Sequence, residues 1–288
     1  MKVSLVMAAY NRAHTLPRAI DSVLAQDYPD WESVIVDDGS RDDTVEVVAR
    51  YTDSRIKLVR HAENRGVTAA KNTGFDHATG EWIATLDSDD ELAPGALSTF
   101  MRALTEVDPG LDAIACNCVD SRTGRFSGDG YTGDRYIDVG TQLRETRGEF
   151  WGMFRARLLG TSRFDERIAG REAALWTRIH AGARWYYLHQ GLRVYHTEGS
   201  DRLTARKASN LRANPRQYRS FVVLTEETPD YLATLRAHSP RSYGDLMSAA
   251  AAQFLASGDL RRAAGALART VEGYGLAALD RLGSPRRR

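Results

Sequence analysis

The chain has 288 residues, of which 42% are hydrophobic and 27% charged, so it can bury a full core and carry a smaller appendage. Its formal net charge of +1 lacks the basic surplus of duplex-binding proteins, and we therefore expect no nucleic-acid partner. No segment has the roughly 18 apolar residues that a membrane-spanning helix requires, and no signal peptide is evident. We expect a cytoplasmic protein, with peripheral attachment at the inner face of the membrane as an option.

The first 110 residues alternate predicted strands with predicted helices. Apolar runs bounded by turn signals predict the strands, and apolar residues at helical spacing predict the helices between them. This alternation is typical of βαβ units on a mostly parallel sheet, which binds ligands at the carboxyl ends of its strands. The predicted strands cover residues 3–8, 31–36, 56–59 and 82–86, and the predicted helices begin after Thr15, after Asp42 or Asp43, and at Val67.

After about residue 110 the pattern becomes less regular. Cys116 and Cys118 lie on an apolar run, where strand geometry would place them on alternate faces. A disulfide between them would be awkward, so we expect buried thiols in a reducing compartment. The elements predicted here are a helix over 170–181 and strands over 185–188 and 192–195.

From about residue 206 the composition turns rich in alanine and arginine. Gly258 separates two helical stretches and is predicted to end the first of two antiparallel helices. We expect this tail to serve packing or dimerisation, so a homodimer through the C-terminal helices is one option. The competing interpretation is docking to a membrane surface or a carrier protein through Arg261, Arg262 and Arg286 to Arg288.

Three carboxylates, Asp87, Asp89 and Asp90, follow the fourth predicted strand. They lie where the chain leaves the sheet, and like charges so close together usually require a cation to offset their repulsion. Hard oxygen ligands at this spacing suit Mg²⁺ or Mn²⁺, ions that in turn hold a diphosphate. A helix N-cap is the competing interpretation, but a cap needs only one Asp.

Four motifs in register resemble those of family 2 glycosyltransferases of the GT-A fold: V-S-L-V-M-A-A-Y-N-R, V-I-V-D-D-G-S, E-N-R-G-V-T-A-A-K-N-T-G and L-D-S-D-D. The resemblance is dense over residues 3–95 and weaker to about 205. It implies a nucleotide-sugar donor, a divalent metal, and inversion at the anomeric carbon. The implied organisation is a Rossmann-like α/β domain over 1–205, with a nucleotide-sugar-binding half (1–110) and an acceptor-binding half (111–205), and a C-terminal helical extension over 206–288.

The resemblance implies that the nucleoside lies at the ends of the first two strands. Asp38 matches the family's Asp that contacts the base, and its carboxylate suits a uracil imide or a ribose hydroxyl. Ala8, Tyr10 and Asn11 follow the first strand, where a backbone group and a ring face can hold the base. A solvated turn is the competing interpretation for the Asp38 segment.

A second group of residues is implied at the diphosphate and its metal. Lys71 would place a cation near the phosphates or the base, unless it lies on a solvated helix face. Asp89 is the expected metal ligand, and Asp90 competes for that role. The remaining residues implied here are Asp87 at the ribose, Ser88 at the diphosphate, His196 at the metal and Arg202 over the phosphates.

Inverting transfer also needs a general base for the acceptor. The segment F-D-E followed by G-R-E-A-A-L-W-T-R resembles the family's acceptor-side motif, and the alignment places the catalytic acid at Glu172, with Asp165 as the fallback. Arg171 replaces the family's preceding acid and would lower the pKa of Glu172, or would bind an acidic acceptor or a phosphate. Trp151 and Met153 are expected to line the acceptor side, with core packing as the competing interpretation.

The sequence therefore predicts a metal-assisted hexosyl- or N-acetylhexosaminyl-transferase that uses a UDP-sugar. The acceptor is left open between a glycan, a lipid-linked sugar and a small molecule, free or on a carrier protein. One rival is a non-catalytic nucleotide-sugar-binding protein. The other is a sugar nucleotidyltransferase, which would carry a glycine-rich loop after the first strand, where this chain has A-A-Y-N-R.

Overall fold

The computed structural model describes residues 1–168, 172–198 and 214–283. The chain forms two compact units. The first contains Met1–Asp138, Glu145–Glu166 and Ile179–Asp201, and the second contains Val139–Arg144, Arg167–Arg178 and Arg202–Arg288. The predicted helical extension over 206–288 thus falls in the second unit, together with two short segments from earlier in the chain.

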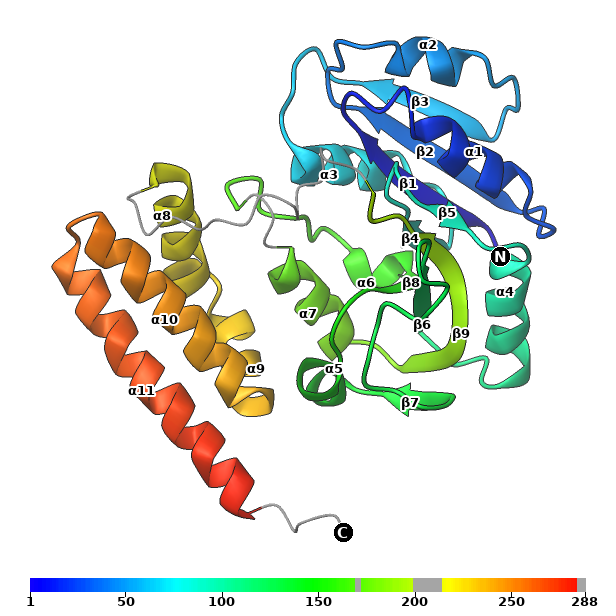
Figure 1. Cartoon of the computed structure of the whole chain (residues 1–288). Helices are drawn as coiled ribbons and strands as arrows, with labels where there is room; N and C mark the ends of the chain where they lie inside the picture. Colours follow the sequence, from blue (N-terminus) through cyan, green and yellow to red (C-terminus); the bar gives the residue numbers. More distant parts are fainter. Residues whose placement is uncertain (169–171, 199–213, 284–288) are drawn as a thin grey trace. The chain divides into compact units, whose positions relative to one another are not determined.

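The first unit is built on a sheet of nine strands (Figure 1). The strands are β1 Val3–Ala9, β2 Trp31–Asp37, β3 Ile56–Arg60, β4 Trp82–Thr85, β5 Glu91–Leu92, β6 Ala113–Asp120, β7 Arg135–Ile137, β8 Phe150–Arg155 and β9 Trp185–Tyr195. Their order is β3-β2-β1-β4-β8-β6-β9-β5, with β7 also beside β9. Strands β3-β2-β1-β4 and the pair β6-β9 are parallel, whereas β8, β5 and β7 run antiparallel to their neighbours.

Helices flank this sheet, as the sequence predicts (Figure 1). Their apolar residues recur at helical spacing, and in the first helix Leu16, Ala19, Ile20 and Val23 are all buried. The α/β fold with a mostly parallel central sheet is confirmed. The helices that lie wholly or partly in this unit are α1 Leu16–Leu24, α2 Thr44–Ala49, α3 Val67–His77, α4 Ala96–Glu106, α5 Val139–Glu145, α6 Ala156–Leu159 and α7 Ala173–Ala181.

Two details differ from the prediction. The segments 185–188 and 192–195 form one strand, β9, because β6 pairs along its whole length across a register shift between Cys116 and Cys118. The expectation that Cys116 and Cys118 lie on alternate faces is wrong, because side chains two residues apart on a strand point to the same face. Both belong to the same core cluster, where they are free thiols with no exposed surface. Burial raises the pKa of both thiols, as expected for inert cysteines.

Glu32 is a buried charge at the amino-terminal edge of the parallel strands, the edge opposite the strand ends where the acidic motif lies. Its side chain is 1% exposed. It accepts hydrogen bonds from Lys2 Nζ at 2.8 Å, Lys57 Nζ at 2.7 Å and Ser4 Oγ at 2.6 Å. The main-chain N–H of Thr79 adds a fourth at 2.6 Å. Full satisfaction of its acceptors is what allows this carboxylate to be buried.

Glu32→Gln is expected to lower the free energy of unfolding at pH 7 by about 2–3 kcal/mol, a cost typical of losing hydrogen bonds to a charged group. Burial alone would raise the pKa of Glu32, but its lysine, serine and backbone donors outweigh burial and lower it. A lowered folded-state pKa contributes stability above the unfolded-state value of about 4.3, and this stability is lost as the pH falls through the folded-state pKa. Urea unfolding at pH 7 and pH 3.5 should therefore show a smaller pH effect in Glu32→Gln than in wild type. The exposed Glu106 provides the control Glu106→Gln, and an equal pH effect in all three proteins would contradict the prediction.

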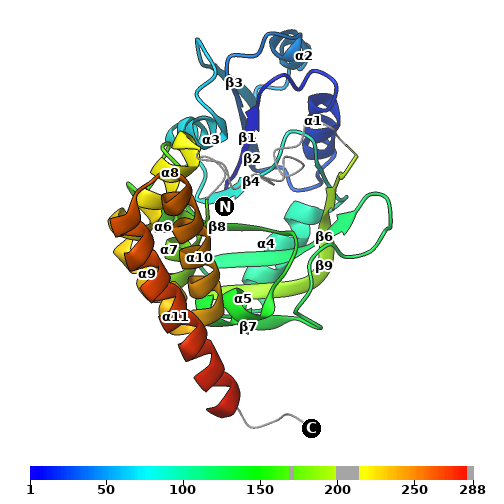
Figure 2. The same cartoon turned by 60° about the vertical axis from the view of Figure 1, so that its left-hand side comes forward.

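The second unit is helical. Its elements from the C-terminal region are α8 Pro215–Val222, a π-helical turn Val223–Glu227, α9 Pro229–His238, α10 Pro240–Ala256 and α11 Leu260–Gly283. Figure 2 shows α10 and α11 packed side by side as a helical hairpin. Gly258 lies between them at φ +78°, and the Asp259 N–H bonds back to the Phe254 carbonyl at 2.9 Å, which confirms the predicted cap. No helix in the described ranges is both long and apolar enough to cross a membrane.

Candidate functional site

The carboxyl ends of three neighbouring parallel strands place the predicted donor residues together. The sheet order β2-β1-β4 brings the loop after β1, the turn after β2 and the acidic loop after β4 to one edge. Backbone hydrogen bonds continue the strand pairing into these loops and fix how the three segments are aligned along the strands. The Asp38 N–H bonds to the Ala9 carbonyl at 2.8 Å, and the Leu86 N–H bonds to the Val6 carbonyl at 3.0 Å. The predicted edge of the sheet is therefore where Tyr10, Asp38 and Asp87 lie.

A buried arginine supports the acidic loop. Arg193 is 5% exposed and lies on β9, opposite Leu92 of β5. Its guanidinium donates to Asp87 Oδ2 at 2.6 Å and, through Nε, to Asp90 Oδ2 at 2.9 Å, and its Nη2 also contacts Asp90. Lys71, 8% exposed on α3, places Nζ 3.7 Å from Asp87 Oδ1. Two cations thus hold the Asp87 carboxylate from two sides.

The two held carboxylates have different pKa values. Desolvation opposes ionisation of Asp87, but the charges of Lys71 and Arg193 outweigh it and lower the pKa to about 2. Burial raises the pKa of Asp90 to about 6, although the paired Arg193 opposes that shift. Asp87 is accordingly ionised throughout the physiological range.

Asp90 and His196 are both engaged with the protein. Asp90 is 1% exposed and accepts the His196 main-chain N–H at 2.8 Å in addition to the Arg193 contacts. The His196 ring places Nε2 2.7 Å from Glu91 Oε1. Asp90 therefore anchors β9 to the acidic loop, and the His196 imidazole pairs with Glu91, instead of both facing an open metal position as the sequence predicts.

Asp89 differs from its neighbours. It is partly exposed, and its main-chain carbonyl accepts a hydrogen bond from Arg18. Among the residues that the structure describes, no donor contacts the Asp89 carboxylate. Ser88, between Asp87 and Asp89, is buried.

The carboxylates of the acidic loop fit a divalent ion only if substrate phosphates complete its coordination. Four carboxylates lie close to three cations here, so the loop carries an excess of negative charge that a metal would offset; the residues are Asp87, Asp89, Asp90 and Glu91 with Arg18, Lys71 and Arg193. In the described part of the chain, no group of three or more His, Cys, Asp or Glu side chains is arranged to hold a metal alone. Mg²⁺ commonly binds through one or two carboxylates plus substrate phosphates, and Asp89 fits that pattern.

Asp38 has a structural role that its residue type does not reveal. The side chain is 2% exposed and accepts the main-chain N–H groups of Arg65 at 2.9 Å and Gly66 at 2.7 Å. His61 Nδ1 lies 2.7 Å from the same carboxylate, and its Nε2 lies 2.9 Å from Thr73 Oγ1. Asp38 thus fixes the loop that leads into α3 and Lys71. A carboxylate has about four acceptor sites, so a contact to a base would add to these bonds.

The loop after β1 is fixed by hydrogen bonds and exposes the ring of Tyr10. Asn11 adopts a left-handed φ of +53°, donates its N–H to Ser40 Oγ at 2.8 Å and accepts the Arg41 N–H at 2.9 Å. The preceding Tyr10 is 37% exposed, while Ala8 is partly buried at the end of β1. A ring that is exposed beside a fixed loop is available to stack on a planar ligand.

The predicted acceptor-side residues separate into several groups. Met153 is fully buried, and Trp151 is 3% exposed with Nε1 bonded to the Thr85 carbonyl at 2.9 Å. Both therefore pack in the core, because β8 is an interior strand of the sheet, and neither lines a surface.

Glu172 belongs to the second unit, where its carbonyl accepts the Trp176 N–H at the start of α7. Arg171, predicted on the acceptor side, lies outside the described residues, and so does Arg202, which was predicted over the donor phosphates.

The segment around Asp165 is attached to α3. Asn72, next to Lys71, accepts the Phe164 N–H at 2.8 Å and donates to the Phe164 carbonyl at 2.9 Å and to Glu166 at 3.1 Å. Asp165 is thereby fixed to the helix that carries Lys71.

Sequence reasoning missed three residues that organise this site. These are Arg193, His61 and Asn72. A signal for Arg193 exists in the sequence, since a single arginine interrupts the apolar run L-R-V-Y near the carboxyl end of a strand. A charged residue at such a position usually has a buried partner.

Comparison with known proteins agrees with this geometry. The sequence model described as glycosyl transferase family 2 matches residues 4–158, more than half of the chain. A Campylobacter jejuni protein, GalNAc(5)-diNAcBac-PP-undecaprenol beta-1,3-glucosyltransferase, is 36% identical over 217 residues, which cover 73% of this chain and 69% of that protein. The Escherichia coli protein WfgD, a UDP-Glc:alpha-D-GlcNAc-diphosphoundecaprenol beta-1,3-glucosyltransferase, is 46% identical over 88 residues, 31% of this chain and 35% of its own length.

A solved structure shows the same fold. The crystal structure of S. aureus TarS 1-349 in complex with UDP superposes with a TM-score of 0.61 at 17% identity, covering 100% of this chain and 93% of that one. The strand order, the acidic loop and these matches lead to one conclusion. The chain belongs to glycosyl transferase family 2 and is a glycosyltransferase with a GT-A fold.

Proposed function

We propose that this enzyme transfers a hexosyl or N-acetylhexosaminyl residue from a UDP-sugar, with inversion, to a sugar linked to a polyprenol diphosphate. The observation that carries the donor part is the carboxylate of Asp89, which no donor among the described residues contacts. It lies beside Asp87, whose carboxylate pairs with Lys71 and Arg193. UDP is supported by the printed names of the WfgD relative and of the TarS complex. The acceptor class is supported by the undecaprenol-linked substrates named for both relatives.

Within this proposal, Asp89 would hold Mg²⁺ or Mn²⁺ together with the donor phosphates. The bound ion would stabilise the negative charge that develops on the leaving diphosphate. Lys71 supplies a fixed positive charge at the same edge of the sheet, and Tyr10 provides a ring face for the base. Asp38 holds the loop that positions Lys71. Peripheral attachment of the enzyme to the membrane that contains the acceptor belongs to the same proposal.

The general base is proposed to be Glu172, and Asp165 is the alternative. The two carboxylates can be distinguished by parallel Glu172→Gln and Asp165→Asn variants, which remove the charge and keep the shape. Loss of the base should lower kcat by about 10²–10⁴ and leave UDP affinity unchanged. The variant that behaves in this way identifies the base, and near-wild-type kcat in both variants would exclude each of them.

The donor proposal is tested by thermal shift of the full chain with UDP, GDP and dTDP, each with Mn²⁺ or with EDTA. Ligands that bind the folded state raise the midpoint of unfolding. A shift with UDP that depends on Mn²⁺ is expected. A shift with GDP alone, or one of equal size in EDTA, would contradict the UDP or the metal part of the proposal, respectively.

The acceptor proposal needs a separate assay. Radiolabelled UDP-glucose, UDP-GlcNAc and UDP-GalNAc would each be offered to GlcNAc-diphosphoundecaprenol and to the same sugar without its lipid. Transfer from one donor to the lipid-linked sugar, with inversion seen by NMR of the product, is expected. Equal transfer to the lipid-free sugar would show that the lipid diphosphate is not recognised.

A further inference from the structure

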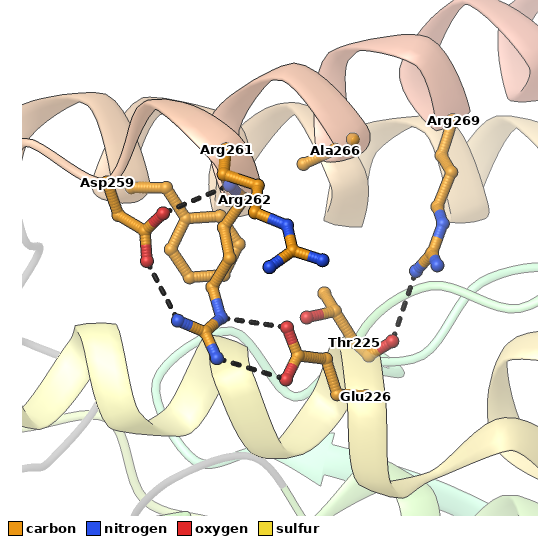
Figure 3. A pocket seen from close by; sticks show the side chains of 9 residues that line it. Thr225, Glu226, Asp259, Arg261, Arg262, Ala266 and Arg269 are labelled. Atoms are coloured by element: carbon orange, nitrogen blue, oxygen red, sulfur yellow. Dashed lines mark hydrogen bonds and ion pairs between the residues drawn. The ribbon is translucent and has the colours of Figure 1, made fainter.

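The helical second unit contains a cavity of about 430 Å³ (Figure 3). It lies between the first turns of α11, the π-helical turn and α10. A second cavity of about 670 Å³ shares Thr225, Glu226 and Arg269 with it. Three arginines of α11, Arg261, Arg262 and Arg269, are among the residues that line the first cavity.

Arg262 is neutralised within the cavity wall. Its Nε donates to Glu226 Oε1 at 2.8 Å, and its Nη1 donates to Asp259 Oδ2 at 2.8 Å. Asp259 is further held by the Tyr218 hydroxyl at 2.7 Å. Both carboxylates that line the cavity are thus engaged with one arginine, which acts as a fixed part of the wall.

The other two arginines have no carboxylate partner among the described residues. Arg269 Nη1 donates only to the Thr225 main-chain carbonyl at 3.1 Å, a neutral acceptor that orients the guanidinium and leaves its charge uncompensated. Figure 3 shows the Arg261 guanidinium extending into the space between Arg262 and Arg269. Three guanidinium groups therefore line the cavity beside two carboxylates, Glu226 and Asp259.

Two of these arginines lie at the positive end of the α11 macrodipole. Arg261 and Arg262 occupy the first turn of the helix, and Asp259 just before it accepts the Arg262 main-chain N–H at 3.0 Å and so caps the helix. Arg262 is balanced by Glu226 and Asp259, whereas Arg261 has no carboxylate partner in the described part of the chain and extends into the cavity, so Arg261 is arranged to receive an anion. Guanidinium groups bind phosphate through paired, parallel hydrogen bonds.

We propose that this cavity is a binding site for a phosphate group, mono- or diphosphate, contacted by Arg261 and Arg269. The volume of about 430 Å³ accommodates the phosphate, and the neighbouring cavity of about 670 Å³ lets the rest of the ligand continue past Arg269. The phosphate belongs either to a lipid headgroup or to a soluble phosphate compound. This site goes beyond the proposed donor and acceptor chemistry, since all its residues lie in the helical unit.

The test is calorimetric titration of the full chain with inorganic diphosphate in EDTA and at constant ionic strength. Arg261→Ala and Arg269→Gln should each weaken binding by about tenfold or more. Arg261 makes no ion pair in the described structure, so its variant should fold normally even if Arg269→Gln is destabilised. Arg241→Ala, at an exposed arginine of α10 outside the cavity, is the matched control and should bind like wild type.

Vesicle flotation separates the two sources of phosphate. Binding to phosphatidic-acid vesicles but not to phosphatidylcholine vesicles, lost in Arg261→Ala, would assign the site to a lipid headgroup. Diphosphate binding without vesicle binding would assign it to a soluble phosphate compound. Diphosphate affinity that is the same in wild type, Arg261→Ala and Arg241→Ala, or no tighter than that for chloride, would overturn the proposal.

Discussion

Asp89→Asn is expected to lower kcat/KM by a factor of about 10²–10³ and to remove the Mn²⁺-dependent part of UDP binding. The reason is the charge balance of the acidic loop. Asp87 and Asp90 are held by Arg193, and His196 pairs with Glu91, so Asp89 carries the carboxylate left for a metal. The amide keeps the shape of the side chain and removes its charge.

The same variant should be as stable as wild type without ligand, because no donor in the described structure contacts the Asp89 carboxylate. This separates a loss of metal from a loss of fold. The matched control is Asp43→Asn, at an exposed acid that begins α2 without a side-chain cap bond, and it should change neither activity nor UDP binding. The prediction is measured by titrating UDP with Mn²⁺ and with EDTA. Equal UDP affinity of wild type and Asp89→Asn in Mn²⁺ would show that Asp89 holds no metal.

The fold of the donor half was predictable because it depends on local signals. Each of the first four strands is an apolar run that ends in polar turn residues, and parallel strands bring those ends to one edge of the sheet. Tyr10, Asp38 and Asp87 could therefore be grouped from their order alone. Residues 185–195 were harder, because the polar stretch between the two apolar runs resembles a turn, yet it remains paired to β6 across a bulge.

The side-chain partners at the site were not predictable in the same way. Arg193 lies 103 residues after Asp90 in the chain, and only the pairing of β5 with β9 brings the two together. Sequence patterns also do not reveal that Asp38 is turned inward to bind the loop before α3. Trp151 and Met153 were predicted to line the acceptor side but are buried in the core. Alternation within a short apolar run does not tell whether a strand lies inside the sheet or lines a surface.

Arg193→Met is expected to lower the free energy of unfolding at pH 8 by about 3–5 kcal/mol, the cost of leaving a buried charge without its partner. Methionine fills a similar volume but cannot donate to Asp87 or Asp90. Asp87 is 45% exposed on its side chain and can recruit water, whereas Asp90 is 1% exposed and cannot. Urea unfolding measures the loss, and Arg193→Lys, which keeps the charge but not the forked geometry, should fall between wild type and Arg193→Met.

The pH dependence of this loss follows from Asp90. Its pKa is already raised to about 6 by burial, and removal of Arg193 should raise it further. A folded-state pKa above the unfolded value of about 3.9 means that ionised Asp90 destabilises the fold at pH above its pKa and that protonation relieves the cost. Arg193→Met should therefore lose less stability at pH 5 than at pH 8. Replacing both partners, in Arg193→Met with Asp90→Asn, should restore most of the stability at pH 8, because neither position of the buried pair then carries a charge. A double variant no more stable than Arg193→Met would mean that Arg193 acts through Asp87 or through packing, and not through its pairing with Asp90.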